Sequence, residues 1–506
     1  MRAGDALANF SDRLLAGGRA TDPAVVDGRQ RFSHAELRTA AATVAGALHP
    51  LSLEPGSRIA VVGPNSFFWV AAYLAAMKLG VAVPLSDKNT VSDLAAQAEW
   101  AGCTAVLIDR RAQRRLGEAF AGLPQITDAV LAEPGEEYWP STTDDPGADA
   151  ALMFTSGTTA RPKAVRITHA NLHANTTAIA SYLGLECSDR MLVVLPFHYC
   201  FGASLLHTHL AAGGSVVLCN SFTFPETAVD LIASESCTGF AGVPSSFQLL
   251  LRASSYGSRQ LPSLRLVQQA GGRLAPEVIR EVAAAQPGSD LFVMYGQTEA
   301  TARLSYLPPA ALPDKIGSIG KGIPGVELTV QDEAGRPVSP GEEGEIVARG
   351  ASISPGYYRD PEATAEKFPA GVLHTGDLAT VDHEGFIYIV GRSGEFIKSW
   401  GYRVSPSQVE EAALAHPAVS ESAAVGLPDP EAGEAITLAV VPMPRLALDP
   451  GDLLSFLAGR LPKYMVPESV RVLPSLPLNA SGKVARAQLR ALLARKTPEG
   501  DVSTVE

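Results

Sequence analysis

Hydroxyl-bearing residues, glycine and lysine are concentrated in residues 155–163, directly after the apolar stretch 151–154. The run consists of Thr155, Ser156, Gly157, Thr158, Thr159, Ala160, Arg161, Pro162 and Lys163. Several hydroxyl donors, backbone N–H groups and a cation suit a polyphosphate, because its charge is best bound by several fixed donors at once. Solvated turns often share this composition. The apolar stretch before the run and the lysine that closes it favour a phosphate-binding loop.

This loop is not a Walker A motif. That motif needs a glycine immediately before its lysine and a hydroxyl immediately after it. Pro162 and Ala164 occupy those places here. We therefore predict a phosphate-binding loop of another kind.

Five further motifs follow the loop along the chain. They are Tyr295-Gly296-Gln297-Thr298-Glu299, Gly344-Glu345-Ile346, His374-Thr375-Gly376-Asp377, Gly391-Arg392 and Asn479-Ala480-Ser481-Gly482-Lys483. Together with the loop they resemble, in the same order, the adenylate-forming superfamily of acyl-CoA synthetases, peptide-synthetase adenylation domains and luciferases. One such motif is weak evidence, whereas six in family order are specific and run through most of the chain. The resemblance implies activation of a carboxylic acid by ATP, as an acyl-AMP.

The resemblance also assigns residues to ATP and Mg²⁺. Tyr295 would stack on adenine, Thr298 would hold the α-phosphate, and Glu299 would bind Mg²⁺, which prefers hard oxygen ligands. Asp377 would accept hydrogen bonds from the ribose hydroxyls and Arg392 would donate to the same sugar, although a surface ion pair is their alternative. The other residues assigned to the nucleotide are Thr155, Ser156, Gly157, Thr158, Thr159, Lys163, Gly271 and Gly272, with Thr155 also a ligand of Mg²⁺.

Lys483 lies in a glycine-containing loop near the C-terminus, where a lone lysine is usually solvated. The resemblance makes it the catalytic lysine. Attack of a carboxylate on the α-phosphate brings two anions together, and a mobile cation can stabilise the charge that develops. Positioning, Mg²⁺ and cationic stabilisation should supply most of the acceleration. The residues expected to act in catalysis are Lys483, Thr298, Glu299 and His198.

The acid substrate is expected to lack an α-amino group. Relatives that activate amino acids bind the α-ammonium with an aspartate in a Phe-Asp-Ala-Ser-type stretch, whereas this chain has Phe201-Gly202-Ala203-Ser204. We therefore predict a fatty or aromatic acid. The segment Phe197-His198-Tyr199 resembles acyl-CoA synthetases, in which this place lies beside the carboxylate; a structural core histidine is the alternative for His198.

The resemblance also outlines the acid pocket, which should be mostly apolar. Its expected wall consists of Phe201, Gly202, Ala203, Leu206, Val243, Gln268, Ala270, Met294, Ala302 and Arg303. Arg303 is the charged member. It would either contact a polar or anionic end of the substrate or pair with a carboxylate at the pocket rim.

The acyl acceptor is expected to be a thiol, most simply that of CoA. The phosphopantetheine of a carrier protein is an alternative acceptor, and no carrier domain is recognisable in the chain. Two further alternatives are adenylation of an unusual oxyacid such as nitrite with transfer to an amine, and an inactive nucleotide-binding scaffold. Release of pyrophosphate with a panel of acids would separate an enzyme from a scaffold.

The elements that must position these residues indicate an α/β fold. Strand-like stretches at 58–63, 81–85 and 191–195 alternate with helical patterns at 67–79 and 169–182, the last capped by Thr168. From about residue 310, short strands and glycine-rich turns indicate a β-rich lobe, with a strand at 385–390. We predict an N-terminal domain, residues 1–392, and a mobile α+β C-terminal domain, residues 393–506, whose first helix begins with capping-box spacing at Ser405.

Composition agrees with a multi-domain protein that binds small molecules. The chain has 506 residues, 46% of them hydrophobic, and a formal net charge of −12. That charge argues against a general nucleic-acid binder. The chain shows no signal peptide or membrane-span pattern, so a cytoplasmic location without membrane partners is expected. Five scattered cysteines without C-x-x-C spacing suggest buried free thiols rather than disulfides or a zinc site.

Two departures from the family pattern bear on this reading. Ala160 and Ala164 stand where the family usually has glycine, and an alanine at positive φ would cost on the order of 1 kcal/mol. The hinge position, commonly aspartate or lysine, is Gly394, which would loosen the hinge. Beyond it, Gly401 in residues 398–403 is expected to line the path by which the thiol reaches the adenylate after domain rotation, unless it is an ordinary turn.

We predict that Lys483→Ala lowers the rate of adenylate formation by several orders of magnitude, because no cation would then bridge the two anions. Thioester formation from a pre-made acyl-adenylate should survive. Pyrophosphate exchange and single-turnover thioester assays separate the two steps. Near-normal exchange in the mutant would remove Lys483 from the mechanism.

Overall fold

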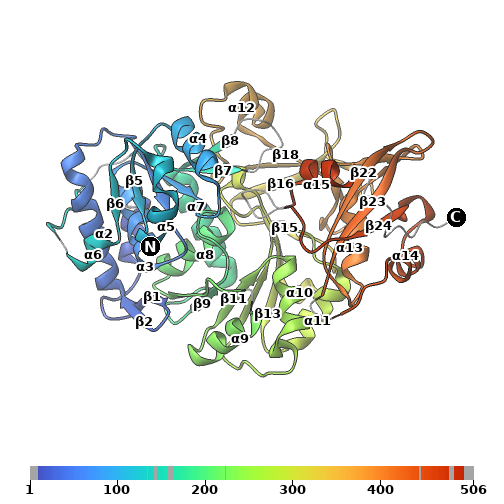
Figure 1. The fold of residues 1–506 in the computed structure, drawn as a ribbon, viewed down its shortest axis with the longest axis horizontal. Coiled ribbons are helices and arrows are strands. Elements are labelled where there is room, and N and C mark those ends of the chain that lie inside the picture. The colour runs from blue at the N-terminus through green and yellow to red at the C-terminus, as the bar shows by residue number, and fades with distance from the viewer. Residues whose placement is uncertain are drawn as a thin grey trace.

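The computed structural model describes residues 9–133, 135–141, 145–155, 163–222, 224–443, 446–477 and 484–494 (Figure 1). It contains four β-sheets: one of nine strands, one of six, one of four, and one of five near the C-terminus. The predicted class is confirmed: a large N-terminal part of α/β subdomains with a β-rich lobe, followed by a small α+β part. The predicted border at 392/393 falls where β19 (Ile387–Arg392) ends and stays a prediction.

The six-stranded sheet carries the two strands that flank the phosphate loop. Its order is β6-β5-β3-β4-β7-β8. The strands are β3 (Arg58–Val62), β4 (Val81–Leu85), β5 (Cys103–Ile108), β6 (Gln125–Thr127), β7 (Asp149–Thr155) and β8 (Lys163–Thr168). Its neighbours pair in parallel, except that β7 and β8 are antiparallel with Thr155 opposite Lys163. Helices α4 (Val91–Ala101) and α5 (Arg110–Leu116) pack on its outer face.

The nine-stranded sheet carries most of the expected acid pocket. Its order is β15-β14-β13-β12-β11-β9-β10-β1-β2. The strands are β1 (Pro23–Asp27), β2 (Gln30–Ser33), β9 (Arg190–Val193), β10 (Ser215–Leu218), β11 (Gly239–Gly242), β12 (Leu266–Gln269), β13 (Asp290–Tyr295), β14 (Ser305–Leu307) and β15 (Lys321–Gly322). Helices α9 (Pro225–Ser234), α10 (Pro244–Ala253) and α11 (Pro276–Ala285) cover its outer face.

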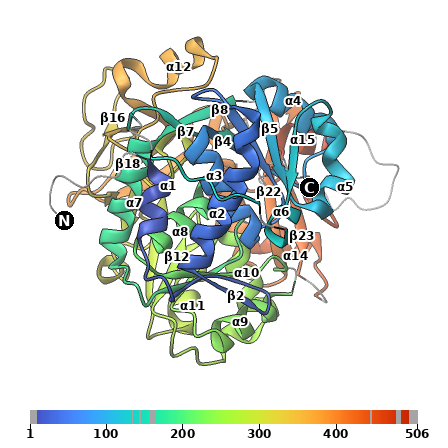
Figure 2. The same cartoon turned by 90° about the vertical axis from the view of Figure 1, so that its left-hand side faces the viewer.

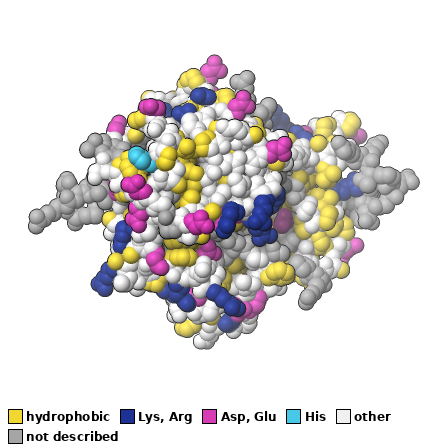
Figure 3. All heavy atoms as spheres, turned by 60° about the vertical axis from the view of Figure 1, so that its left-hand side comes forward, with side chains coloured by type: hydrophobic (Ala, Val, Ile, Leu, Met, Phe, Trp, Pro, Cys, Tyr) yellow, Lys and Arg dark blue, Asp and Glu magenta, His cyan; other side chains and the backbone are white. Residues whose placement is uncertain are grey.

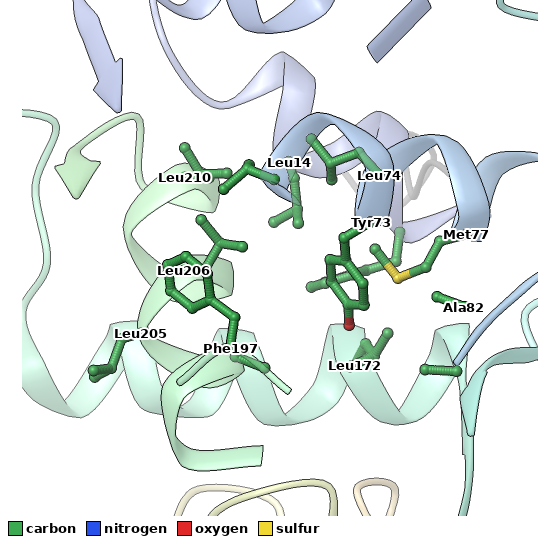
Figure 4. Close-up of a cluster of buried hydrophobic side chains, with 14 of the residues drawn as sticks. Leu14, Tyr73, Leu74, Met77, Ala82, Leu172, Phe197, Leu205, Leu206 and Leu210 are labelled. Atoms are coloured by element: carbon green, nitrogen blue, oxygen red, sulfur yellow. The ribbon is translucent and has the colours of Figure 1, made fainter. Parts of the chain in front are cut away.

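A layer of helices separates the two large sheets (Figure 2). It contains α1 (Phe10–Ala16), α2 (His34–Leu48), α3 (Phe67–Leu79), α7 (His169–Leu183) and α8 (Cys200–Ala211), while the short α6 (Ala129–Ala132) packs beside α2. Every residue of α3 from Phe67 to Lys78 is buried, as expected for a helix that is apolar all round. Figure 4 shows Tyr73 and Met77 of α3 facing Leu206 and Leu210 of α8 across this core.

The β-rich lobe is a four-stranded antiparallel sheet. Its strands are β16 (Val326–Gln331), β17 (Gly344–Gly350), β18 (Leu373–Val381) and β19, with α12 (Pro361–Lys367) between β17 and β18. The predicted strand at 385–390 begins two residues later, because Gly385 has φ 83° and closes a turn with Asp382. The lobe therefore places Asp377 and Arg392 opposite each other on β18 and β19.

The C-terminal part is a five-stranded sheet with helices on both faces. Its strands are β20 (Ile397–Ser399), β21 (Tyr402–Val404), β22 (Val419–Asp429), β23 (Gly433–Pro442) and β24 (Ser469–Val472). Helices α13 (Pro406–Leu414) and α14 (Pro450–Ala458) pack on one face and α15 (Arg486–Ala494) on the other. Arg273 pairs with Glu411 at 2.8 Å, and Gln248 donates to the Leu414 carbonyl at 3.1 Å, so α13 contacts the large part directly.

Two predicted helices are present, whereas one predicted cap and one predicted strand end differ from the structure. The helices at 67–79 and 169–183 are present, and Thr168 caps the second one with a capping box. The capping box expected at Ser405 is wrong: α13 begins at Pro406, but the Ser405 side chain makes no capping bond. The strand at 191–195 ends earlier, at Val193, because the Asn65 amide binds the Leu195 carbonyl and the Phe197 N–H and turns the chain.

The exposure of the cysteines agrees only partly with the prediction that they are buried free thiols. All five cysteines are free, but Cys187 is exposed and Cys200 half-buried, so the expectation of buried thiols holds for three. On the face drawn in Figure 3, acidic and basic side chains are interspersed. Among the helices of the described ranges, none is long and apolar enough to cross a membrane.

Asp189 joins the starts of three strands of the nine-stranded sheet. Its side chain is 1% exposed and accepts hydrogen bonds from Arg265 Nε at 2.8 Å, Thr238 Oγ1 at 2.7 Å and the Glu186 N–H at 2.8 Å. Burial acts to raise the pKa of this carboxyl, but the hydrogen bonds from Arg265, Glu186 and Thr238 outweigh it and lower the pKa. The network therefore stabilises the ionised form.

We predict that Asp189→Asn lowers the free energy of unfolding at pH 7 by about 1–3 kcal/mol, because charge-assisted hydrogen bonds are lost. A pKa depressed in the folded state gives stability that is present above the unfolded value, about 4, and is lost as pH falls. The difference in thermal midpoint between the mutant and the wild type should therefore shrink towards pH 3. Asp314→Asn, at an exposed position, is the control. If the difference in thermal midpoint between Asp189→Asn and the wild type did not change with pH, the ionised state assigned to Asp189 would be contradicted.

Candidate active site

A carboxylate on the β-rich lobe binds a hydroxyl from the nine-stranded sheet. Tyr295, at the end of β13, donates its hydroxyl to Asp377 Oδ2 at 2.5 Å. Arg392 Nε donates to Asp377 Oδ1 at 2.8 Å. Burial, followed by the charge of Asp377, raises the pKa of Tyr295, and the same charge raises the pKa of Arg392. Three residues expected to bind the nucleoside are thus brought together.

Tyr357 links the phosphate loop with the expected metal ligand. Lys163 Nζ lies 5.1 Å from the centre of the Tyr357 ring, and the Tyr357 hydroxyl donates to Glu299 Oε1 at 2.8 Å. Residues 356–358 pair with the edge of β8 and so hold the ring there. A side chain at Gly356 would meet Thr364 at 2.3 Å. Tyr357 was not predicted from the sequence, although a glycine followed by an aromatic residue was a visible signal.

Lys367, at the end of α12, is a second lysine of this region that sequence reasoning missed. Its ammonium donates to the Thr375 carbonyl at 2.8 Å. Burial lowers its pKa, while the nearby carboxylates of Glu299, Asp377 and Glu345 act in the opposite direction. Glu345 in turn accepts from the Gly376 N–H at 2.8 Å. No sequence signal distinguishes Lys367 from other helix-end lysines.

The segment from Tyr295 to Arg303 is tightly folded. A side chain at Gly296 would meet the Ala302 carbonyl oxygen at 1.9 Å, so the motif requires glycine there. Thr301 has φ 68°, an uncommon value for a β-branched residue, and its hydroxyl donates to the Ser352 carbonyl at 2.7 Å. Such strain is concentrated at functional sites. Thr298, in the same segment, lies 3.5 Å from Cys200 Sγ at the start of α8.

The described residues include only the two ends of the phosphate loop. Thr155 and Lys163 pair as the last and first residues of β7 and β8. Ser156, Gly157, Thr158, Thr159 and Ala160 lie outside the described residues, so their roles stay predictions. Ala164 lies within β8 and is not among the residues with positive φ, so the strain considered for it does not arise.

Lys483 also lies outside the described residues, so its catalytic role stays a prediction. The residues on either side of positions 478–483 are described. The Ala485 N–H donates to the Pro477 carbonyl at 2.8 Å, which brings the two sides of the segment together. Arg486 then pairs with Glu410 and lies 3.5 Å from Glu395. Burial acts to lower the pKa of Arg486, and the charges of Glu410 and Glu395 raise it. The contact with Glu395 places the start of α15 against the segment that follows β19.

His198 is held in a neutral form. It is 8% exposed, and burial, followed by the charge of Lys88, lowers its pKa to about 3. Its Nε2 atom has no hydrogen-bond partner among the described residues. A neutral imidazole can donate or accept a hydrogen bond but supplies no charge to a carboxylate. Whether it acts on substrate stays a prediction.

Most residues expected around the acid lie on three elements or directly after a strand. Phe201, Gly202 and Leu206 belong to α8, Gln268 to β12, and Met294 to β13, while Val243 and Ala270 follow strands. A side chain at Gly202 would meet the Pro196 carbonyl oxygen at 2.1 Å, so an aspartate could not be placed there without moving the backbone. Gly271 has φ 84°, and a side chain on it would contact Val243 at 2.9 Å. A side chain on Gly272 would lie 3.1 Å from Pro244.

Comparisons with known proteins agree with this arrangement. The profile described as "AMP-binding enzyme" matches residues 15–358, and the profile of its C-terminal domain matches residues 408–483. Feruloyl-CoA synthase from an Amycolatopsis species is 32% identical over 475 residues, which cover 92% of this chain and 95% of that protein.

Solved structures with the same fold include o-succinylbenzoate CoA synthetase from Bacillus subtilis. Its complex with the acyl-adenylate intermediate has a TM-score of 0.86 and 30% identity, covering 97% of this chain and 99% of that one. Its complex with ATP and magnesium ion has a TM-score of 0.85 and 30% identity, covering 95% and 99%. This chain therefore belongs to the AMP-binding enzyme family, the adenylate-forming superfamily that its motifs resemble.

Proposed function

We propose that the protein uses ATP to convert a carboxylic acid into an acyl-AMP and then transfers the acyl group to the thiol of CoA. The observation that carries this proposal is the convergence of Tyr295, Asp377 and Arg392 beside the pair formed by Glu299 and Tyr357. The relatives that bind ATP with magnesium, form an acyl-adenylate or are named CoA ligases support it.

Asp377 can accept from a ribose without losing its present partners. A carboxylate has about four acceptor positions, and Tyr295 and Arg392 use two of them. The two that remain match the two hydroxyls of a ribose. The hydrogen bond from Tyr295 also fixes the direction of its ring, on which adenine would stack.

The Glu299 carboxylate is suited to magnesium because it, too, has acceptor positions that its protein partner does not use. Tyr357 occupies one of its oxygens, and the carboxylate keeps further acceptor positions for a hard cation. Magnesium bound there would offset the charge of the phosphates during acyl-AMP formation. Thr155 is the second proposed ligand, and Lys163 would place its ammonium near the same phosphates.

We infer that the acid lacks an α-ammonium group. Gly202 leaves no anchoring carboxylate, and His198, neutral and buried, offers no negative charge in its place. CoA is the proposed acceptor because the named relatives are CoA ligases. A carrier-protein phosphopantetheine presents the same thiol and is the alternative, which a direct comparison of acylation rates would separate.

ATP–pyrophosphate exchange with a panel of acids tests the proposal. Exchange should depend on Mg²⁺ and on acids without an α-amino group, and addition of CoA should yield the thioester. Absence of exchange with every acid would refute the proposed function. A preference for an α-amino acid over its deaminated analogue would refute the substrate class alone.

We predict that Tyr357→Phe lowers kcat/KM for adenylate formation by about tenfold or more, because one hydrogen bond to an ionised group is lost. The Mg²⁺ concentration needed for half-maximal exchange should rise, since Glu299 is no longer oriented. Glu299→Gln should show a larger defect of the same kind. Tyr358→Phe is the matched control; an equal loss in both tyrosine variants would indicate a general packing effect.

Gly401 provides a test of the second half-reaction. It follows Trp400 in the two-residue turn between β20 and β21, and the two residues have φ 51° and 78°. Nothing lies within 4 Å of a side chain placed on Gly401, so added bulk is tolerated here apart from the backbone strain.

We predict that Gly401→Leu exchanges pyrophosphate normally but fails to form the thioester, because a bulky side chain would block the thiol after domain rotation. Gly401→Ala carries similar strain of about 1 kcal/mol without the bulk and should retain both activities. Equal loss of both half-reactions in the leucine variant would point to a folding defect, and loss of neither would remove this turn from the mechanism.

A further inference from the structure

Arg303 is a buried cation without an anionic partner among the described residues. Its side chain is 2% exposed, one of the largest fully buried side chains of the protein. Tyr182 and Cys200 are the groups that influence its pKa besides burial, and no described Asp or Glu forms an ion pair with it. One terminal nitrogen of the guanidinium has no hydrogen-bond partner within the described ranges. The alternative that Arg303 pairs with a rim carboxylate is therefore wrong for this part of the chain.

The guanidinium is nevertheless held in a defined position. It lies 4.1 Å from the centre of the Phe201 ring, and its Nε donates to Met294 Sδ at 3.4 Å. The Tyr182 hydroxyl donates to the same sulfur at 3.1 Å. The backbone is fixed as well, because the Asn175 amide donates to the Arg303 carbonyl at 3.0 Å. These contacts orient Arg303 without using its full donor capacity.

A second buried polar group on the same sheet lacks partners. Gln268 is 0% exposed, and neither its amide oxygen nor its amide nitrogen has a partner among the described residues. Its neighbours at alternate positions, Leu266 and Ala270, pack in one cluster with Met294, whereas Val267 packs on the opposite face. Gln268 therefore faces the same side of the sheet as Met294.

These unused groups imply a ligand. A buried polar group without a partner is costly, and a buried charge without one is more so. An arginine binds a carboxylate through two parallel hydrogen bonds, with strong geometric preference. Phe201, Met294 and Ala270 supply apolar surface between these polar groups and the rest of the expected pocket. The arrangement suits a molecule with an apolar body and an anionic end.

We propose that Arg303, assisted by Gln268, binds a second carboxylate of the substrate, remote from the carboxylate that is adenylated. The substrate is thus a dicarboxylic acid with an apolar linker. This inference rests on the proposed function, because it concerns the acid used in the same reaction. Arg303 is already buried without substrate, so substrate binding does not add the free-energy cost of removing water from its guanidinium.

The test compares dicarboxylic acids with their monomethyl esters, which keep the size but lose one charge. Glutarate, adipate and terephthalate are assayed with the esters by ATP–pyrophosphate exchange. For at least one pair, wild-type kcat/KM should favour the diacid by about tenfold or more. Arg303→Met, similar in length and uncharged, should reduce that ratio to near one, and Arg303→Lys should leave an intermediate ratio. Arg252→Met, which removes a surface arginine paired with Glu281, should leave the ratio unchanged.

The outcomes distinguish this inference from the function on which it rests. Exchange with monocarboxylates at equal or higher efficiency than with every diacid would overturn the inference and leave the function intact. Equal losses for diacid and ester in Arg303→Met would show that Arg303 only supports packing. Exchange with no acid would overturn both. If Arg303→Met does not fold, the thermal midpoint of the wild-type protein is measured with each diacid and with its monomethyl ester. A larger increase with the diacid would support the inference, and equal increases would overturn it.

Discussion

The hydrogen bonds that converge on the carboxylate of Asp377 hold the site together. One partner, Tyr295, ends a strand of the nine-stranded sheet, and the other, Arg392, ends the four-stranded sheet immediately before the C-terminal part. A single buried carboxylate thus joins the nine-stranded sheet to the four-stranded sheet. Buried hydrogen bonds that share one acceptor strengthen one another, so Tyr295, Asp377 and Arg392 form a cooperative network.

Tyr357 plays a similar role for the charged groups. Its ring faces Lys163 and its hydroxyl binds Glu299, so a cation and a carboxylate are held apart on one side chain rather than neutralising each other in an ion pair. The Lys367 ammonium donates a hydrogen bond to the Thr375 carbonyl, and the charges of Glu299, Asp377 and Glu345 act on its pKa. Charges kept separate in this way are available to a ligand that carries both phosphate and metal.

Burial has different consequences for the two basic residues expected near the acid. It lowers the pKa of both His198 and Arg303. The ordinary pKa of histidine is close to 6.5, so burial removes its charge, whereas that of arginine is so high that the guanidinium stays protonated. The expected pocket would therefore have a neutral group at His198 and a permanent charge at Arg303.

The sequence by itself determined the motifs, their order and the class of fold. Glycine, hydroxyl and apolar patterns are local, so the helix at 67–79 and the strand before the phosphate loop could be predicted within about two residues. The strand that follows the loop, β8, was not predicted. Asp377 and Arg392 were recognisable because each lies in a short family motif that is contiguous in sequence. The tertiary structure decided which side chains meet across 58 to 82 positions, such as Tyr357 with Glu299 and Tyr295 with Asp377. It also decided that Arg303 has no carboxylate partner in the described part of the chain, because partners and burial depend on packing between distant segments, which no local pattern records.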